Sequence, residues 1–209
     1  MIHYPKRLQV LAASLSALAG YVDALGFLKL GGFFVSFMSG NSTRMSVGIV
    51  EKTSDAAIAG SLIALFVVGV MSGSLVGHKA GQRRRPAVLA AVALLLTVAA
   101  VSEHLALGAL AVAALALAMG AENAVFDRDG EVSIGLTYMT GTLVKFGQRL
   151  AHSVMGGDRW AWLPYLVLWA GLALGASAGA YVYNTLGFET GISIAAFVSI
   201  VFAVLAIWL

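Results

Sequence analysis

The sequence contains no cysteine, few charged residues and no recognisable metal motif. The absence of cysteine excludes disulfide bonds and thiolate metal sites. Charged residues make up 11% of the 209-residue chain, whereas a soluble domain carries about 25%. The four histidines, His3, His78, His104 and His152, lack the spacing of metal ligands. We therefore expect neither a soluble domain nor a metal centre.

Motifs of enzyme chemistry are also missing. The sequence has neither a phosphate-binding loop nor a nucleophile beside a base, so we predict no enzymatic activity and no cofactor. The net charge of +3 is typical of basic cytoplasmic loops in a membrane protein and not of a nucleic-acid surface. We expect the chain to contact the lipid bilayer and not nucleic acid.

Apolar sequence is abundant: 60% of the residues are hydrophobic and the mean hydropathy is +0.90. A helix that crosses a bilayer needs about 20 apolar residues. The first such run follows Lys6 and Arg7 and resembles a signal peptide, but it continues to Phe27, so we interpret it as a membrane helix. The predicted membrane helices are residues 8–28, 56–77, 86–101, 105–126, 160–183 and 191–209.

Two further segments, residues 33–50 and 132–150, are apolar at both ends and polar in the middle. Hydrocarbon tolerates no unpaired backbone groups, so broken helices at membrane depth must face protein or water. Gly40 favours unwinding, and a half-helix starting there would direct free N–H groups into a cavity. The candidate solute-binding residues are Ser39, Gly40, Asn41, Ser42 and Thr43 in the first segment and Thr140, Gly141 and Thr142 in the second.

Several motifs recur at an offset of 100 to 102 residues. The pentapeptide 20–24 matches 120–124, Met38-Ser39-Gly40 matches Met139-Thr140-Gly141, and Arg44 falls opposite Lys145. Two GxxxGxxxG patterns also correspond, one at Gly69, Gly73 and Gly77 and the other at Gly171, Gly175 and Gly179. Ordered matches of this kind predict one membrane domain over 1–209, with internal repeats at about 8–102 and 105–209.

The distribution of basic residues favours six membrane crossings over eight. If both polar segments cross, in a 4+4 arrangement, five basic residues lie on one side and six on the other. If both re-enter, nine lie on one side and two on the other, which follows the positive-inside rule. We therefore predict an all-α protein of six transmembrane helices and two re-entrant segments in a 3+3 inverted repeat. Both termini are then cytoplasmic, and Arg44 and Lys145 lie within the membrane.

Charged residues near the two polar segments suggest that these segments also have an electrostatic role. Arg44 and Lys145 are predicted either to attract an anion or to neutralise Asp23 and Glu122. Such pairs also serve proton coupling, because a carboxyl group between water and a cation can change its protonation. Asn123, which matches Asp23 in the repeat, removes the symmetry of such a relay.

The glycine patterns predict close helix packing, since glycine lets two helix backbones approach each other. The same faces offer a surface for a homo-oligomer.

Three motifs together carry a resemblance to a known family: residues 20–24, the Phe37–Asn41 element FMSGN, and Met139-Thr140-Gly141-Thr142. With these motifs the chain resembles the YoaK-like family of bacterial inner-membrane proteins, which is classed as a domain of unknown function. The resemblance covers essentially the whole chain. It implies several membrane helices and the bacterial inner membrane, and it implies no substrate.

Two functions remain open from the sequence. The first is a small secondary transporter or channel for a small polar solute, anions included, with proton coupling and a midplane site between the two broken segments. The second is a non-transporting scaffold or partner-binding subunit, in which the polar segments are structural and the glycine faces bind another membrane protein.

Overall fold

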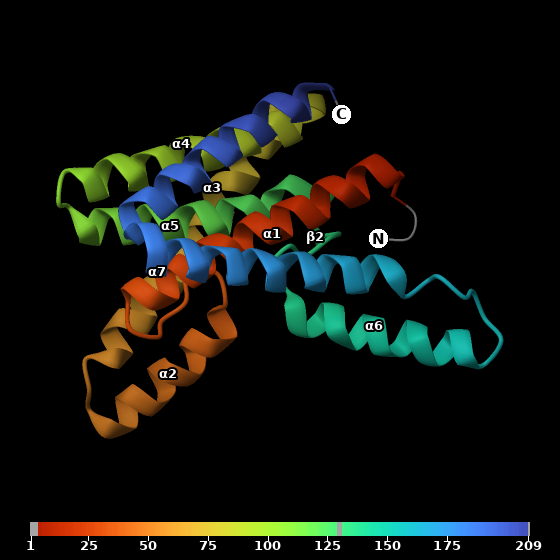
Figure 1. The fold of residues 1–209 in the computed structure, drawn as a ribbon, viewed down its shortest axis with the longest axis horizontal. Coiled ribbons are helices and arrows are strands. Elements are labelled where there is room, and N and C mark those ends of the chain that lie inside the picture. Colours follow the sequence, from red (N-terminus) through yellow and green to blue (C-terminus); the bar gives the residue numbers. More distant parts are fainter. Residues whose placement is uncertain (1–3, 129–130, 209) are drawn as a thin grey trace.

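The computed structural model describes residues 4–128 and 131–208. These residues are almost entirely helical, which confirms the all-α prediction (Figure 1). The helices are α1 (Lys6–Lys29), α2 (Met38–Glu51), α3 (Asp55–Ala80), α4 (Arg84–His104), α5 (Gly108–Glu122), α6 (Met139–Val154) and α7 (Leu163–Leu205), with short 3-10 turns η1 (Gly81–Arg83), η2 (Asn123–Phe126) and η3 (Ala206–Trp208). A hairpin pairs β1 (Asp127–Arg128) with β2 (Glu131–Val132) in antiparallel register.

Four helical stretches of the described chain are long and apolar enough to cross a membrane: Lys6–Lys29, Asp55–His104, Gly108–Phe126 and Leu163–Trp208. The second and fourth, of 50 and 46 residues, are about twice the length that a bilayer requires. Each contains a reversal at a glycine with positive φ, Gly81 at 54° and Gly187 at 84°. The chain turns back on itself at both points (Figure 1).

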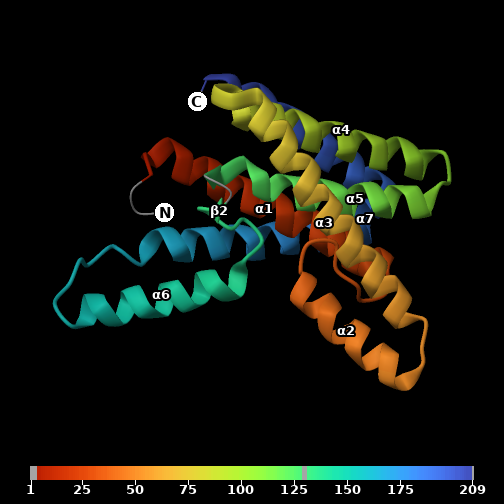
Figure 2. The ribbon, with the colours of Figure 1, turned by 180° about the vertical axis from the view of Figure 1, so that it is seen from behind.

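These reversals leave six apolar helical segments in the described chain, and they lie side by side in one bundle (Figures 1 and 2). The predicted helices 86–101 and 105–126 place their connection at residues 102–104. This prediction is wrong by three residues, because 102–104 complete α4 and the chain turns through Leu105–Leu107. Ala106, with φ 58°, makes that turn.

Glycine permits the closest helix contacts, which lie within the chain. A methyl group at Gly69 would overlap the carbonyl oxygen of Leu117 in α5, and one at Gly175 would overlap that of Ala17 in α1. The paired contacts therefore join α3 to α5 and α1 to α7. Because the α5 and α1 backbones occupy these glycine faces, they are not available to a second copy of the chain or to another membrane protein.

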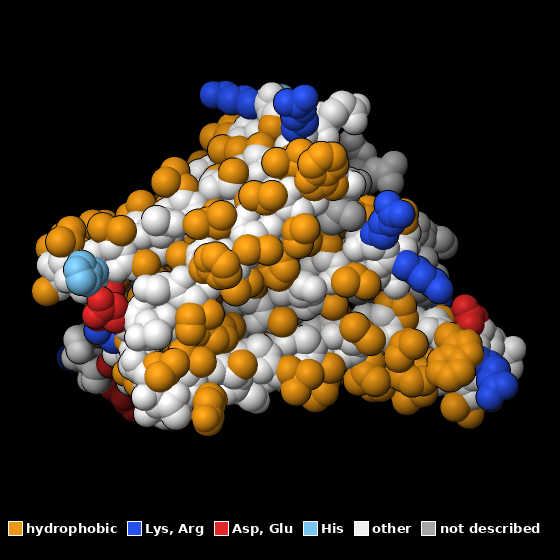
Figure 3. Space-filling view, turned by 45° about the horizontal axis from the view of Figure 1, so that its top comes forward, with side chains coloured by type: hydrophobic (Ala, Val, Ile, Leu, Met, Phe, Trp, Pro, Cys, Tyr) orange, Lys and Arg blue, Asp and Glu red, His pale blue; other side chains and the backbone are white. Residues whose placement is uncertain are grey.

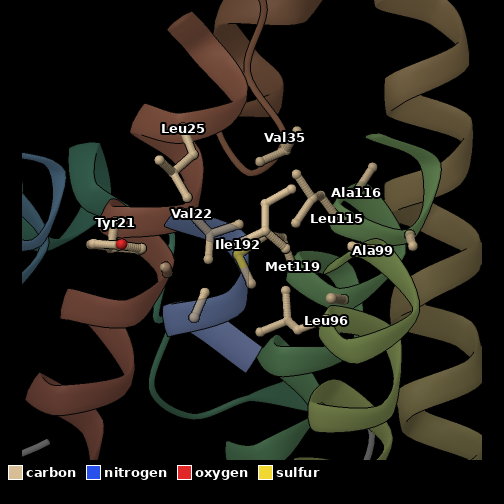
Figure 4. Packing of buried hydrophobic residues seen from close by; sticks show 14 of the residues in the cluster. Tyr21, Val22, Leu25, Val35, Leu96, Ala99, Leu115, Ala116, Met119 and Ile192 are labelled. Carbon is tan, nitrogen blue, oxygen red and sulfur yellow. The ribbon is translucent and has the colours of Figure 1, made fainter. Parts of the chain in front are cut away.

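Interlocking aliphatic side chains form the core at the centre of the bundle (Figure 4). Val22 and Leu25 of α1 meet Met119 of α5 and Ile192 of α7 there, and all four are fully buried. Val35, from the connection between α1 and α2, inserts into the same cluster. The core thus fixes the irregular segment that leads into α2.

The outer surface of the bundle is apolar, and the charged side chains lie at its two ends. At one end, Lys29 Nζ lies 2.6 Å from Glu103 Oε1, and His104 Nδ1 lies 2.7 Å from Glu189 Oε1. The N-terminal end of α1, the turn between α3 and α4, and η3 meet at the other end (Figure 1). Figure 3 shows apolar side chains between these ends, with Lys and Arg along the top and right edges. Apolar surface of this extent is what a lipid-facing bundle requires.

Helices α2 and α6 stand apart from this bundle. Both begin near its middle and run outward toward opposite ends of the molecule (Figures 1 and 2). Each is shorter than a membrane crossing, at 14 and 16 residues. Helix α2 packs against α3, and α6 packs lightly against α7.

Candidate functional site

The irregular backbone of the first polar segment precedes the polar residues. Gly31 and Gly32 have φ values of 63° and 107°, and the chain remains non-helical until α2 begins at Met38. The predicted break at Gly40 is therefore wrong, because Gly40 lies within a continuous helix. The hydroxyls of Ser42 and Thr43 bond to carbonyls four residues back and do not interrupt that helix.

Asp23 holds this irregular segment against α1. Its Oδ1 atom accepts hydrogen bonds from the N–H groups of Val35, at 2.9 Å, and Ser36, at 2.7 Å. Both of these residues are buried, so the carboxylate satisfies two backbone donors that water does not reach. The predicted ion pair between Asp23 and Arg44 is not formed within the described residues.

Asn41 clamps the same segment from the other side. Its amide oxygen accepts the Phe34 N–H at 3.0 Å, and its amide nitrogen donates to the Phe34 carbonyl at 2.6 Å. The side chain is fully buried. Because both ends of the amide bind backbone, Asn41 shapes the approach to α2 and does not present its amide to a solute.

The second half holds the segment that leads into α6 at the corresponding place. Thr137 Oγ1 donates to Asn123 Oδ1 at 3.2 Å, and Asn123 Nδ2 donates to the Met119 carbonyl at 3.0 Å. Thr137 stands directly before Tyr138 and α6, just as Ser36 stands before Phe37 and α2. A residue near the end of α1 or α5 therefore anchors the approach to each short helix.

A pocket of about 400 Å³ separates the starts of α2 and α6. Its walls are Ser36, Phe37, Met38 and Ser39 from the first half, Thr137, Tyr138, Met139, Thr140 and Gly141 from the second, and Phe66 of α3. The residues before the two helices, Phe37 and Tyr138, provide no side-chain cap. The first N–H groups of a helix have no partner inside it, and they carry the positive end of its dipole. The Met38 and Met139 N–H groups bond to the carbonyls of Ser36 and Thr137. Two helix starts without a side-chain cap thus meet at one pocket.

The predicted solute-binding residues divide into two groups. Ser39, Thr140 and Gly141 line the pocket. Gly40, Asn41, Ser42, Thr43 and Thr142 do not line it. Gly40 and Gly141 are both the third residue of their helices, but the rings of Phe34 and Phe37 cover Gly40, whereas nothing lies within 4 Å of a β-carbon at Gly141.

The sequence analysis missed Ser36, Phe37, Thr137 and Phe66 as lining residues. The repeat contained a signal for three of them. The residues before the matched Met38 and Met139 are a hydroxyl residue followed by an aromatic one, Ser36-Phe37 in the first half and Thr137-Tyr138 in the second.

The predicted cations occupy different environments. The Arg44 guanidinium carbon lies 4.3 Å from the centre of the Phe33 ring, and its Nη1 atom is buried without a hydrogen-bond partner among the described residues. Lys145 is exposed on α6, and the predicted ion pair between Lys145 and Glu122 is not formed within the described residues. Glu122 is fully buried, and neither carboxyl oxygen has a hydrogen-bond partner in the described chain.

No cluster of three or more His, Asp or Glu side chains suited to a metal ion occurs within residues 4–128 and 131–208. The pocket is lined by hydroxyl residues from both halves and by aromatic and methionine side chains, and its surface is mainly apolar.

Comparison with known proteins agrees with this architecture. Residues 11–205 match the family described as "Protein of unknown function (DUF1275)". The chain is 40% identical over 178 residues to a UPF0700 transmembrane protein of Rhizobium meliloti (strain 1021), and the match covers 85% of this chain and 76% of that protein. No solved structure matches the chain. The resemblance found in the sequence is thereby confirmed: this multi-pass membrane protein belongs to the DUF1275 family.

Proposed function

We propose that this protein is a secondary transporter or channel that carries a small polar solute across the bacterial inner membrane. The observation that carries the proposal is the pocket between the uncapped starts of α2 and α6. Helix starts that point into a cavity near the middle of a membrane domain are typical of transporter binding sites. Both helices direct positive dipole ends at the pocket, so small anions and neutral hydrogen-bond acceptors are the favoured solutes.

The proposed membrane arrangement is a 3+3 inverted repeat. In this proposal the six apolar segments cross the bilayer. Helices α2 and α6, which run from near the middle of the bundle toward opposite ends of the molecule (Figure 1), re-enter it from opposite faces. The parallel anchors, Asp23 with Ser36 and Asn123 with Thr137, support a shared origin for the two halves. In this arrangement the Arg-rich turn between α3 and α4 and both ends of the described chain are cytoplasmic.

Cysteine labelling tests this topology without removing any native thiol, because the chain has none. Lys52 and Arg83 are both exposed. A membrane-impermeant maleimide added to intact cells should label Lys52→Cys, and it should label Arg83→Cys only after the membrane is opened. Labelling of both variants from the same side would contradict the inverted repeat.

Flux through the pocket is tested with two glycines of α6. A β-carbon at Gly141 or at Gly147 would meet no atom within 4 Å, so both positions accept a side chain, but Gly141 lines the pocket and Gly147 does not. Proteoliposomes are compared with empty liposomes by stopped-flow light scattering, with glycerol and urea as neutral probes and acetate and nitrate as anionic probes. We expect faster equilibration of at least one probe in the wild type, a loss of at least tenfold in Gly141→Leu, and no loss in Gly147→Leu. Equal rates with and without protein, or equal effects of the two variants, would contradict transport through this pocket.

We further propose that Glu122 couples the movement of protons to the movement of the solute. A charged carboxylate buried without a partner costs several kcal/mol, and carboxyl groups of this kind within membrane helices mark proton pathways. The neighbouring residue, Asn123, binds the pocket residue Thr137. We expect an imposed pH gradient to accelerate uptake in the wild type and in Glu51→Gln, an exposed control on α2. Glu122→Gln should retain downhill flux and lose this acceleration; a retained pH response would exclude Glu122 as the carrier.

A further inference from the structure

A second pocket lies at the end of the bundle where the N-terminal segment, the turn between α3 and α4, and η3 come together. Its volume is about 530 Å³, and it shares no residue with the pocket between α2 and α6. Its walls are Tyr4, Gly81, Gln82, Arg83, Arg84, Arg85, Pro86, Val125, Phe126, Asp127, Ala206 and Ile207. It is therefore a separate cavity built from distant parts of the chain.

Three consecutive arginines line this cavity, and one of them is fixed. Arg84 Nη1 donates to the Asp127 carbonyl oxygen and lies 3.2 Å from Asp127 Oδ1. Arg83 is exposed and Arg85 is half-buried, and within residues 4–128 and 131–208 neither forms an ion pair. The lining thus contains three guanidinium groups and one carboxylate, and two of the guanidinium groups have no acidic partner there.

The backbone and the apolar wall add to this preference. Helix α4 begins at Arg84, after the η1 turn, so the positive end of its dipole lies at the arginines. Phe126, Ala206 and Ile207 form the apolar side of the cavity, and Ile207 is 65% exposed on the outer surface. A cationic cavity that opens beside an apolar surface matches a phosphate group attached to an apolar body.

We propose that this cavity binds a phosphate group through Arg83 and Arg85, with Arg84 as the fixed wall between them. Guanidinium groups form paired hydrogen bonds with phosphate oxygens, and a lysine in the same place could not. The source is either the headgroup of an anionic phospholipid or a free phosphate compound. The proposal does not depend on the transport function.

Thermal unfolding of the delipidated full chain in an uncharged detergent, followed by tryptophan fluorescence, tests the site. Phosphatidylglycerol, phosphatidylcholine and inorganic phosphate are titrated separately. Phosphatidylglycerol or inorganic phosphate should raise Tm, and phosphatidylcholine, a zwitterionic phospholipid, should raise it less. A response to phosphatidylglycerol alone identifies a lipid headgroup, and a response to inorganic phosphate identifies a free phosphate compound.

The matched variants are Arg83→Gln with Arg85→Gln, and Arg149→Gln with Arg159→Gln. Both double variants lose two positive charges, but Arg149 and Arg159 are exposed and lie outside the cavity. The first should weaken the apparent affinity on the order of tenfold or more, and the second should leave it unchanged. If the first does not fold, Arg83→Gln alone, at an exposed position, replaces it. No response to either anion, or equal weakening by both double variants, would overturn the proposal.

Discussion

Helices α2 and α6 begin at the same pocket, but the segments that lead into them are held very differently. The segment before α2 is fixed by Asp23, which accepts two backbone N–H groups, and by Asn41, which binds both polar groups of Phe34. The segment before α6 is anchored by the Ser16 hydroxyl of α1, which donates to the Leu136 carbonyl at 3.0 Å, and by Thr137, which donates to Asn123. A carboxylate and an amide therefore hold the segment before α2, whereas hydroxyl groups hold the segment before α6.

Helices α2 and α6 also differ in how they pack against the bundle. Helix α2 contacts α3 extensively, and the guanidinium group of Arg44 in α2 packs on the Phe33 ring. Thr142 is the one buried residue within α6. Segments with few buried contacts open at low free-energy cost, and the moving parts of transporters are drawn from such segments. Under the proposed transport function, we expect α6 to be the element that moves and α2 to be the fixed wall of the pocket.

The largest expected effect comes from removing the anchor before each short helix. Asp23→Ala leaves the N–H groups of Val35 and Ser36 without an acceptor. Each buried group that loses its partner costs about 1 to 3 kcal/mol, so the substitution should lower the free energy of unfolding by about 4 kcal/mol. Asn123→Ala removes the hydrogen bonds to Thr137 and to the Met119 carbonyl, neither of which involves a charged group, and should cost about 2 kcal/mol. Thermal unfolding in detergent measures both losses. Equal losses would show that the segments before α2 and α6 are held equally well.

A smaller effect is expected one turn into each helix. Asn41→Leu leaves the Phe34 N–H and carbonyl unpaired and should cost about 3 kcal/mol. Thr142→Val keeps the shape of the side chain and should cost about 1 kcal/mol or less. Proteolysis measures the result locally, because a loosened α2 exposes the peptide bonds of residues 30–37. Greater cleavage around α6 in Thr142→Val than around α2 in Asn41→Leu would reverse the comparison.

The smallest effect concerns the matched cations. Arg44→Gln removes the contact with the Phe33 ring and should cost about 0.5 to 1 kcal/mol. Lys145→Gln alters an exposed side chain and should leave the stability unchanged within about 0.5 kcal/mol. Unfolding of both variants under identical detergent conditions makes the comparison. A larger loss in Lys145→Gln would mean that Lys145 has a partner in the membrane.

The sequence by itself determined the apolar helices and the approximate place of the two short helices, although it placed the start of the first at Gly40 and not at Met38. Lipid imposes long apolar runs, so the ranges 8–28 and 56–77 coincide with α1 and α3. The matched motifs at Met38 and Met139 mark the residues at which α2 and α6 begin. These features depend on composition and local pattern, which can be read without knowing what each segment touches.

Tertiary structure alone decided how the polar side chains are used. Asn41 meets the Phe34 backbone and not a solute, Asp23 meets two N–H groups and not Arg44, and Glu122 meets no polar partner among the described residues. The lining of the pocket by Ser36 and Thr137 likewise follows from where the segments before α2 and α6 lie. The physical reason is that a hydrogen bond requires an atom within about 3 Å, and which atom that is depends on segments far away in the sequence.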